Sequence, residues 1–258
     1  MTVPARIFAV VPAAGVGRRM NGGKPKQYLM LNGKTVLEHS LEKLLLEPRI
    51  QKIIVVLSAD DKYWQSLQIF KNSRIEVVTG GSERCISVLN GMQHLFTGSI
   101  QSVSGDGGRA GGHTQRSRDF DDSWSDSWVL VHDVARPCIR LSDIQKLIAA
   151  LQDHPVGGIL AVPVVDTLKK IGSDQYIETT VDRDDLWQAQ TPQMFPCDML
   201  LNALKDSVEK GFVITDEASA MEFAGFSPLV VEGSPENIKI TRREDLALAE
   251  YYLSKGLM

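Results

Sequence analysis

The chain contains a series of short apolar runs rich in β-branched residues, and this series is the strongest constraint on its fold. Several runs are apolar at successive positions, as are strands buried on both faces of a parallel sheet. Helical patterns lie between them. We therefore predict an α/β fold, a Rossmann-like, mostly parallel sheet with helices on both faces. The predicted strands are Ile7–Val11, Ile53–Leu57, Ile75–Val78, Val129–Val131, Ile159–Val162 and Leu229–Val231.

Helices are predicted over 83–96 and from Thr215 to near Gly225, and three more from apolar stripes and from residues suited to cap a helix. One stripe runs from Val36 to Leu45, and another runs from Ile144 to Leu151 with Ser142 placed to cap its start. Near the end of the chain, Thr241 and Glu244 have the spacing of a capping box ahead of a helix over 246–253. In such folds, ligands bind outside the carboxyl ends of the strands.

Two segments depart from the alternation of strands and helices. Residues 97–127 hold seven Ser, six Gly and five Asp among 31 residues, so they predict a flexible insertion that buries little apolar surface. Its arginines, Arg109, Arg116 and Arg118, are predicted to be solvated. Residues 163–186 place β-type sequence on both sides of a Gly-Ser-Asp turn, which predicts a protruding hairpin arm. A partner subunit would cover the face of such an arm.

Composition excludes several classes of partner and site. The net charge of -4 provides no general attraction for nucleic acid. Three cysteines without a CxxC pair favour a reducing compartment and argue against a disulfide framework or a zinc site. The apolar start is interrupted by Pro12 before it reaches the length of a signal peptide or membrane span, so we expect a cytoplasmic protein without membrane association.

The segment that follows the first predicted strand has the character of a phosphate-binding turn. It reads PAAGVGRRM from Pro12, and Lys24-Pro25-Lys26-Gln27 follows shortly after it. Glycines and small residues allow backbone N–H groups to approach phosphates closely, and the basic side chains add positive charge. The third glycine of the dinucleotide motif GxGxxG is missing, and there is no Gly-Lys-Ser/Thr as in a Walker loop.

These first 30 residues resemble the AAGxGxRM…PKQ signature of nucleotidyltransferases with GT-A-like folds. More closely, the chain resembles the 2-C-methyl-D-erythritol 4-phosphate cytidylyltransferase family of the non-mevalonate isoprenoid pathway. The resemblance continues in family order over nearly the whole chain and implies a single nucleotidyltransferase domain over 1–258. Further matching blocks are Gly80–Arg84 with Ser87, Val131–Pro137, Pro163 with Asp166-Thr167, Val181–Arg183, Gln190–Gln193, Thr215–Ser219 and Asn237–Lys239.

The resemblance implies transfer of CMP from CTP to 2-C-methyl-D-erythritol 4-phosphate with release of pyrophosphate. The attacking phosphate oxygen is already anionic, so positioning and charge neutralisation should dominate over general base catalysis. By resemblance, Arg19 and Lys26 stabilise the transition state, and Lys239 neutralises the α-phosphate or the nucleophile. The remaining CTP-binding residues implied are Pro12, Ala13, Ala14, Gly15, Gly17, Arg18, Gly81, Ser82, Ser87 and Val134. The family usually has alanine where Val134 stands, beside the expected ribose contact.

The resemblance also implies a site for the polyol phosphate and a metal ion. Mg²⁺, or another divalent cation, would be bridged mainly by the CTP phosphates, with Asp133 as a possible ligand. In the family, the arm reaches into the neighbouring subunit, so a homodimer is expected. For Thr215, helix capping and substrate contact both remain open. The residues implied for the polyol phosphate are Asp133, Arg136, Thr167, Arg183, Thr191 and Thr215.

Three other functions remain to be distinguished from this one. Another polyol phosphate, such as ribitol 5-phosphate, would carry the same phosphate and vicinal hydroxyls. A protein that binds CTP without turnover is disfavoured because the cationic positions Arg19, Lys26 and Lys239 are all present. A nicotinamide-dependent dehydrogenase is disfavoured because the GxGxxG turn is absent.

Overall fold

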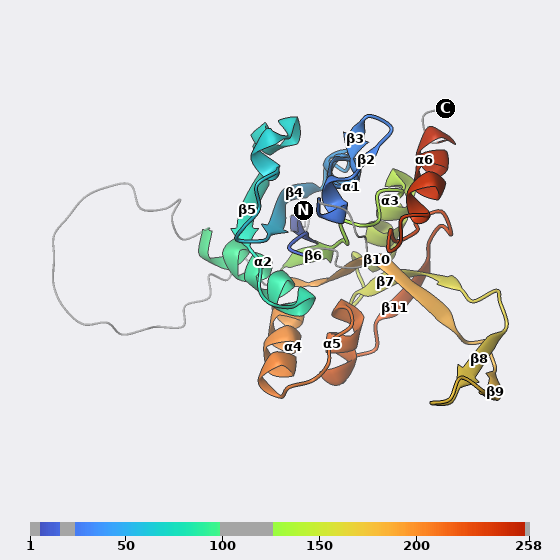
Figure 1. The fold of residues 1–258 in the computed structure, drawn as a ribbon. Coiled ribbons are helices and arrows are strands. Elements are labelled where there is room, and N and C mark those ends of the chain that lie inside the picture. The colour runs from blue at the N-terminus through green and yellow to red at the C-terminus, as the bar shows by residue number, and fades with distance from the viewer. Residues whose placement is uncertain (1–5, 16–23, 99–125, 256–258) are drawn as a thin grey trace, which may run out of the picture.

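The computed structural model describes residues 6–15, 24–98 and 126–255. In this part of the chain a seven-stranded sheet forms the centre, with strand order β11-β7-β10-β6-β1-β4-β5 (Figure 1). All its pairings are parallel except those of β10 with β6 and β7. The predicted α/β class and its mostly parallel sheet are confirmed. The strands are β1 (Arg6–Pro12), β4 (Ile50–Leu57), β5 (Ile75–Thr79), β6 (Ser127–Val131), β7 (Gly158–Pro163), β10 (Trp187–Pro196) and β11 (Leu229–Glu232).

Alternating side chains of each central strand enter opposite hydrophobic clusters. In β1, Ile7, Ala9 and Val11 pack with helices α1 (Val36–Leu45) and α3 (Leu141–Leu151). Phe8 and Val10 belong to the cluster on the other face. The helices of that second face are α2 (Arg84–Gly98), α4 (Cys197–Glu209) and α5 (Glu217–Phe223). Both faces are therefore buried, which explains the uninterrupted apolar runs.

Smaller elements pack beside the C-terminal helix. A short hairpin of β2 (Met30–Leu31) and β3 (Lys34–Thr35) contacts α6 (Asp245–Lys255). Leu31, Val36 and Ile240 are fully buried in a third cluster beside α6. Three 3-10 turns, η2 (Lys26–Tyr28), η3 (Trp64–Ser66) and η4 (Gln68–Lys71), connect the larger elements. The described helices include none long and apolar enough to cross a bilayer.

The central strand β10 was not predicted from the sequence. Its buried end carries polar side chains, and a proline interrupts its β-type pattern, so it lacks the apolar run of the other strands. The structure satisfies these polar groups internally. Gln193 donates to Asp216 and accepts from the backbone N–H of Ala218, and Gln190 donates to the carbonyl of Ser234. A buried polar side chain with such partners avoids the cost of desolvation.

Two predicted helix caps are wrong. Helix α3 begins at Leu141, and its cap residue Arg140 makes no side-chain capping bond, so Ser142 is already inside the helix. Helix α6 begins at Asp245, whose carboxylate accepts from the backbone N–H and hydroxyl of Thr241. The expected Thr241–Glu244 box is absent because the carboxylate of Asp245, one residue after Glu244, accepts from the N–H groups of Thr241 and Arg242.

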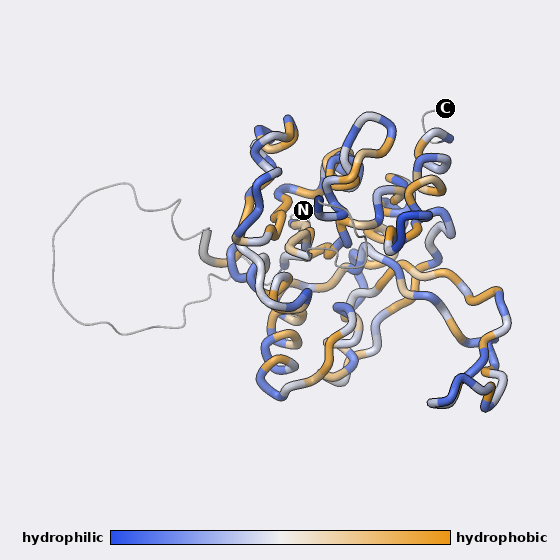
Figure 2. Tube along the Cα trace, viewed as in Figure 1, coloured by the Kyte–Doolittle hydropathy of each residue, from blue (hydrophilic) through white to orange (hydrophobic). Residues whose placement is uncertain are grey.

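Residues 163–186 form an arm that leaves the main body (Figure 1). Within it β8 (Leu168–Ile171) pairs antiparallel with β9 (Ile177–Val181). The arm carries hydrophobic segments although it stands away from the core (Figure 2). Val165 and Tyr176 are 74% and 75% exposed. This exposure leaves a hydrophobic surface that the single chain does not cover.

The predicted insertion at 97–127 has edges that belong to regular structure. Helix α2 continues to Gly98, and β6 begins at Ser127. The remainder, with Arg109, Arg116 and Arg118, lies outside the described residues.

Candidate active site

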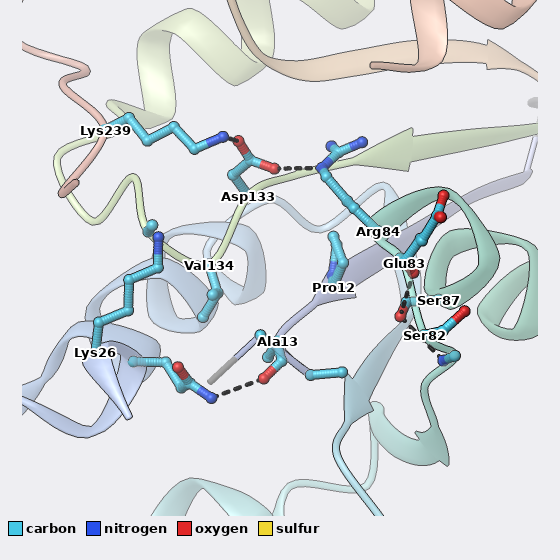
Figure 3. Close-up of a pocket in the computed structure, with 15 residues that line it drawn as sticks. Pro12, Ala13, Lys26, Ser82, Glu83, Arg84, Ser87, Asp133, Val134 and Lys239 are labelled. Atoms are coloured by element: carbon cyan, nitrogen blue, oxygen red, sulfur yellow. Dashed lines mark hydrogen bonds and ion pairs between the residues drawn. The ribbon is translucent and has the colours of Figure 1, made fainter. Parts of the chain in front are cut away.

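A pocket of ≈ 210 Å³ lies where the carboxyl ends of β1 and β6 meet the start of α2 (Figure 3). This is the position at which α/β folds bind ligands. Of the residues predicted to bind CTP, Gly17 and Arg18 lie outside the described residues, as does the predicted transition-state residue Arg19. The pocket is lined by Pro12, Ala13, Ala14, Gly15, Lys26, Gln27, Gly81, Ser82, Glu83, Arg84, Ser87, Asp133, Val134, Ala135 and Lys239.

Backbone hydrogen bonds fix the floor of this first pocket. The N–H of Ala13 donates to Val56 O at 2.8 Å, which extends the pairing of β1 with β4 beyond the strand. The buried amide of Gln27 donates to Ala13 O at 2.7 Å. Gln27 lies in η2, directly after Lys26, whose Nζ is 3.3 Å from Ile240 O. The two segments that resemble the phosphate-binding signature are thus joined at the pocket.

On the opposite side of the first pocket, the turn at Gly80 and Gly81 is tightly packed against its neighbours. A Cβ on Gly80 would lie 2.6 Å from the Cβ of Ala14, and one on Gly81 would lie 2.2 Å from Cγ2 of Ile86. Ser87 Oγ accepts from the N–H of Gly81 at 3.1 Å and donates to Glu83 O at 3.0 Å. A larger side chain at either glycine would displace this turn, so its shape depends on the absence of Cβ atoms.

A second pocket, of ≈ 230 Å³, adjoins the first. The two share Arg84, Asp133 and Lys239, so these three side chains form the boundary between them. The structure brings four residues predicted for the polyol phosphate into this second pocket. Its lining is Arg84, Asp133, Arg136, Ala189, Gln190, Thr191, Gln193, Thr215, Asp216 and Lys239.

The other two residues predicted for the polyol phosphate lie elsewhere. Thr167 and Arg183 are exposed residues of the arm. Arg183 donates through Nη1 to Val165 O, within the arm itself. In the single chain they therefore contribute to neither pocket.

Asp133 is the electrostatic centre of the boundary. Its Oδ1 accepts from Arg84 Nε at 2.9 Å, and its Oδ2 accepts from Lys239 Nζ at 2.7 Å (Figure 3). Arg136 Nε lies 3.9 Å from Oδ2. Burial alone would raise the pKa of Asp133, but Arg84 and Lys239 outweigh it and hold this pKa well below its usual range. Asp133 is therefore an anion among three cations.

Thr215 and Asp216 stand immediately before helix α5. Asp216 is its cap, with a capping box formed with Ser219, and it accepts from Gln193 Nε2 at 2.8 Å. Thr215 lines the second pocket. The capping alternative thus belongs to Asp216, and substrate contact stays a prediction for Thr215.

Sequence reasoning assigned no role to Arg84 and Glu217. Arg84 donates from Nη1 and Nη2 to the two carboxylate oxygens of Glu217, at 2.6 and 3.0 Å. Both residues lie in blocks that match the family, which was the available signal. Glu217 stands in the first turn of α5, where an acidic residue is favourable on general grounds, so its burial could not be predicted.

His132 and Thr191 support Asp133 from behind. Thr191 Oγ1 accepts from the Asp133 backbone N–H at 3.0 Å and lies 3.1 Å from His132 Nδ1. His132 Nε2 is 3.1 Å from Arg136 O, which can only accept. His132 therefore carries its proton on Nε2 and accepts the Thr191 hydroxyl at Nδ1. Complete burial lowers the pKa of His132 to about 4, so the ring is neutral near pH 7.

We predict that His132 makes the stability of the protein fall in mild acid. Its lowered pKa means that the unfolded chain binds a proton more readily between about pH 6.5 and pH 4, so acid favours unfolding there. Between about pH 7.5 and pH 5 the free energy of unfolding should drop by about 2 kcal/mol from this group. Denaturant titrations of wild type and H132N measure it. The variant should show a correspondingly shallower pH dependence, and parallel curves would contradict the assignment.

The described residues contain no cluster of three or more His, Cys, Asp or Glu side chains that could hold a metal ion. Asp133 supplies one carboxylate at the boundary. Mg²⁺ needs few protein ligands when phosphates and water complete its octahedral shell. The donor set thus fits a cation held chiefly by bound phosphates and does not fit a metal bound by protein alone.

A mostly parallel α/β sheet with a small-residue turn and two joined cationic pockets at its strand ends defines a nucleotidyltransferase. The chain belongs to the 2-C-methyl-D-erythritol 4-phosphate cytidylyltransferase family, IspD, whose sequence model matches residues 7–117 and 121–255. The resemblance stated from sequence is thereby confirmed.

Relatives and solved structures agree. The protein of that name from Vibrio atlanticus is 49% identical over 250 residues, covering 97% of this chain and 96% of the relative. The one from Aliivibrio fischeri is 46% identical over 255 residues, covering 99% and 97%. The crystal structure of the Francisella tularensis cytidylyltransferase has a TM-score of 0.74 at 34% identity, covering 96% of this chain and all of that one. For the Thermus thermophilus enzyme the TM-score is 0.70 at 26% identity, with 96% and 98% covered.

Proposed function

We propose that this chain transfers CMP from CTP to 2-C-methyl-D-erythritol 4-phosphate and releases pyrophosphate, a step of non-mevalonate isoprenoid synthesis. The observation that carries the proposal is the shared boundary of the two pockets. A nucleotide in the first pocket and a phosphorylated acceptor in the second would meet at Arg84, Asp133 and Lys239. Two substrates held in contact react as if in one molecule, which is a large part of the catalytic advantage.

The chemistry is a displacement at the α-phosphorus of CTP. An anionic oxygen of the acceptor phosphate forms the new O–P bond, and the bond from the α-phosphorus to the bridging oxygen breaks, so pyrophosphate leaves with the electron pair. No proton has to be removed from the nucleophile. This suits a site in which neutral His132 is occupied by Thr191 and Arg136, and in which cations dominate. Their task is to neutralise the charge that accumulates on the phosphates.

The roles at the triphosphate rest on the family resemblance. Lys26 and Arg19 stabilise the transition state, with Gly15, Gly17 and Arg18 holding the phosphates; of these five residues, the structure describes Gly15 and Lys26. Lys239, on the shared boundary, neutralises the α-phosphate or the incoming oxygen. Lys239 donates to Asp133, and its ammonium group retains further N–H donors for a phosphate.

We expect the first pocket to select a pyrimidine, as the family resemblance implies. Ala13, Ala14, Gly81 and Ser82 bring backbone amide groups to its lining, where they could hydrogen-bond a cytosine. Ser87 already accepts from the Gly81 N–H, so it shapes the turn as well as lining the pocket. Val134 is buried beside the expected ribose, with Pro12 on the other side of the same pocket.

Mg²⁺ would be held mainly by the CTP phosphates, with Asp133 as the carboxylate within reach. When bound, it would supply further positive charge at the phosphates. Each Asp133 oxygen accepts from one cationic side chain, which leaves further lone pairs for a metal contact.

The second pocket holds the polyol phosphate. Asp133 and Arg136 face the hydroxyls and the phosphate of this substrate. Thr215, just before α5, also lines the pocket. Thr191 lines this pocket, but its hydroxyl is engaged by Asp133 and His132, so its contribution is largely to hold Asp133 in place.

The arm supplies Thr167 and Arg183 to the neighbouring subunit of a homodimer. Their exposure and their absence from the lining of both pockets support action in trans, and the exposed apolar arm residues support association. An arginine fork beside a hydroxyl is suited to bind a phosphate. Three buried free cysteines fit a cytoplasmic enzyme.

The direct test is pyrophosphate release with Mg²⁺ and CTP. We expect release with methylerythritol phosphate as acceptor, and little with ribitol 5-phosphate or with ATP, GTP or UTP. Release with ribitol phosphate alone would retain the chemistry and change the pathway. Binding of CTP without release with either acceptor would indicate a non-catalytic nucleotide-binding protein.

Removing the Lys26 ammonium should slow the chemical step. Lys26→Ala is expected to lower turnover at least tenfold, equivalent to ~1.4 kcal/mol of transition-state stabilisation. Lys34→Ala is the control, because Lys34 is an exposed cation paired with Glu42 and lines neither pocket. Steady-state kinetics of both variants decide. Near-normal turnover of the Lys26 variant would remove that residue from the mechanism.

Removing the arm arginine should weaken acceptor binding selectively. Arg183→Ala is expected to raise the KM for methylerythritol phosphate tenfold or more and to leave CTP affinity unchanged. Lys170→Ala, which alters an exposed arm cation paired with Glu178, is the control. Equal losses for both substrates would contradict the assigned clamp. Mixed dimers of the Arg183→Ala and Lys26→Ala chains should regain activity, because one site of each such dimer retains both residues.

A further inference from the structure

Glu217 is a fully buried carboxylate beside the two pockets. It is 0% exposed and stands at the first position of α5, outside the lining of both pockets. Buried ion pairs contribute little to stability on balance, because desolvation offsets their attraction. Its place beside the substrate pockets therefore calls for an explanation other than stability.

The partner of Glu217 is the arginine on the boundary of the two pockets. Arg84 Nη1 and Nη2 donate to the two carboxylate oxygens of Glu217, at 2.6 and 3.0 Å. This paired contact fixes the plane of the guanidinium group. Arg84 Nε then donates to Asp133 Oδ1 at 2.9 Å. Although burial opposes the charged form, the carboxylates of Glu217 and Asp133 raise the pKa of Arg84, so it stays a cation.

These contacts continue to the reactive side of the boundary. The second oxygen of Asp133 accepts from Lys239 at 2.7 Å, and Figure 3 shows Lys239 and Arg84 reaching Asp133 from opposite sides. The row Glu217–Arg84–Asp133–Lys239 alternates in charge and joins α5, the start of α2, the loop after β6 and the segment before α6. Each member restricts the orientation of the next.

We propose that Glu217 is a positioning residue of the transfer reaction, which acts on the site through Arg84; this rests on the proposed function. Glu217 occupies both terminal nitrogens of Arg84, so the guanidinium presents Nε to Asp133 and does not turn its terminal donors toward bound phosphates. Without Glu217, Arg84 becomes a mobile cation in a site for two anionic substrates. Asp133 then loses its contact with Arg84, one of the two contacts that set its orientation. Lys239 is left paired with a carboxylate whose orientation is less restricted.

A double-mutant cycle tests this coupling. Glu217→Gln keeps the shape and removes the charge, and Arg84→Ala removes the group through which Glu217 acts. We expect each single variant to lower kcat/KM at least tenfold. The kcat/KM of the double variant should lie no more than about threefold below that of the less active single variant. Additive losses, or a Glu217→Gln enzyme within about threefold of wild type, would overturn the proposal.

A matched control separates positioning from loss of a buried carboxylate. Glu47 is 1% exposed, accepts from Arg49 Nε at 2.6 Å and from Nη2 at 3.1 Å, and lies outside both pockets. Glu47→Gln should leave kcat/KM within about threefold of wild type even if its melting temperature falls. A loss equal to that of Glu217→Gln would show a general effect of stability and overturn the proposal.

A substrate-free measurement distinguishes this proposal from the proposed function. In ¹⁵N-labelled protein, solvent exchange of the Arg84 Nε–H should be at least tenfold faster in Glu217→Gln and unchanged in Glu47→Gln. If wild type fails to transfer CMP, the proposed function falls, and unaltered Arg84 exchange would separately overturn the role of Glu217. If Glu217→Gln does not fold, the same measurements are made on Glu217→Asp, which keeps the charge but withdraws it from Arg84 by one methylene.

Discussion

The site depends on keeping Asp133 ionised in a buried position. A carboxylate that is 7% exposed would ordinarily bind a proton or be excluded from such a place. Arg84 and Lys239 each occupy one of its oxygens, and Arg136 lies close by. The surrounding elements converge on this arrangement, since its cations come from α2, from the segment before α6 and from the loop after β6. The carboxylate thus organises cations that would otherwise repel one another.

The second requirement is a rigid support beneath Asp133. The antiparallel strand β10 brings Thr191 behind the loop, where its hydroxyl contacts both the Asp133 backbone and His132. Asn237 donates to Thr191 O at 2.8 Å, and Arg136 Nη1 donates to Asn237 O at 2.7 Å. The polar residues that made β10 unlike a strand in sequence are the ones that tie the strand ends together. Polar groups in the centre of this sheet therefore serve to fix geometry.

Local sequence patterns predicted most strands of the sheet, because apolar periodicity acts over a few residues. They did not predict β10, whose polar groups are satisfied by partners such as Asp216 and Ser234 that are distant in sequence. The capping box expected for α6 was wrong because the carboxylate of Asp245, one residue after Glu244, accepts from the Thr241 and Arg242 N–H groups. The Arg84–Glu217 pair spans 133 positions, and no local rule connects such residues.

Strand β10 also leads directly from the arm to the second pocket, which its residues line. It is exposed from Trp187 to Ala189 and buried from Gln190 onward. Inserting one residue here would shift the polar residues from Gln190 onward out of register with β6 and β7. We therefore expect a change of arm length to be tolerated at its tip, near Gly172 and Gln175, where the chain turns with a positive φ at Gln175. Strand β10 thus fixes the number of residues between the arm and the second pocket.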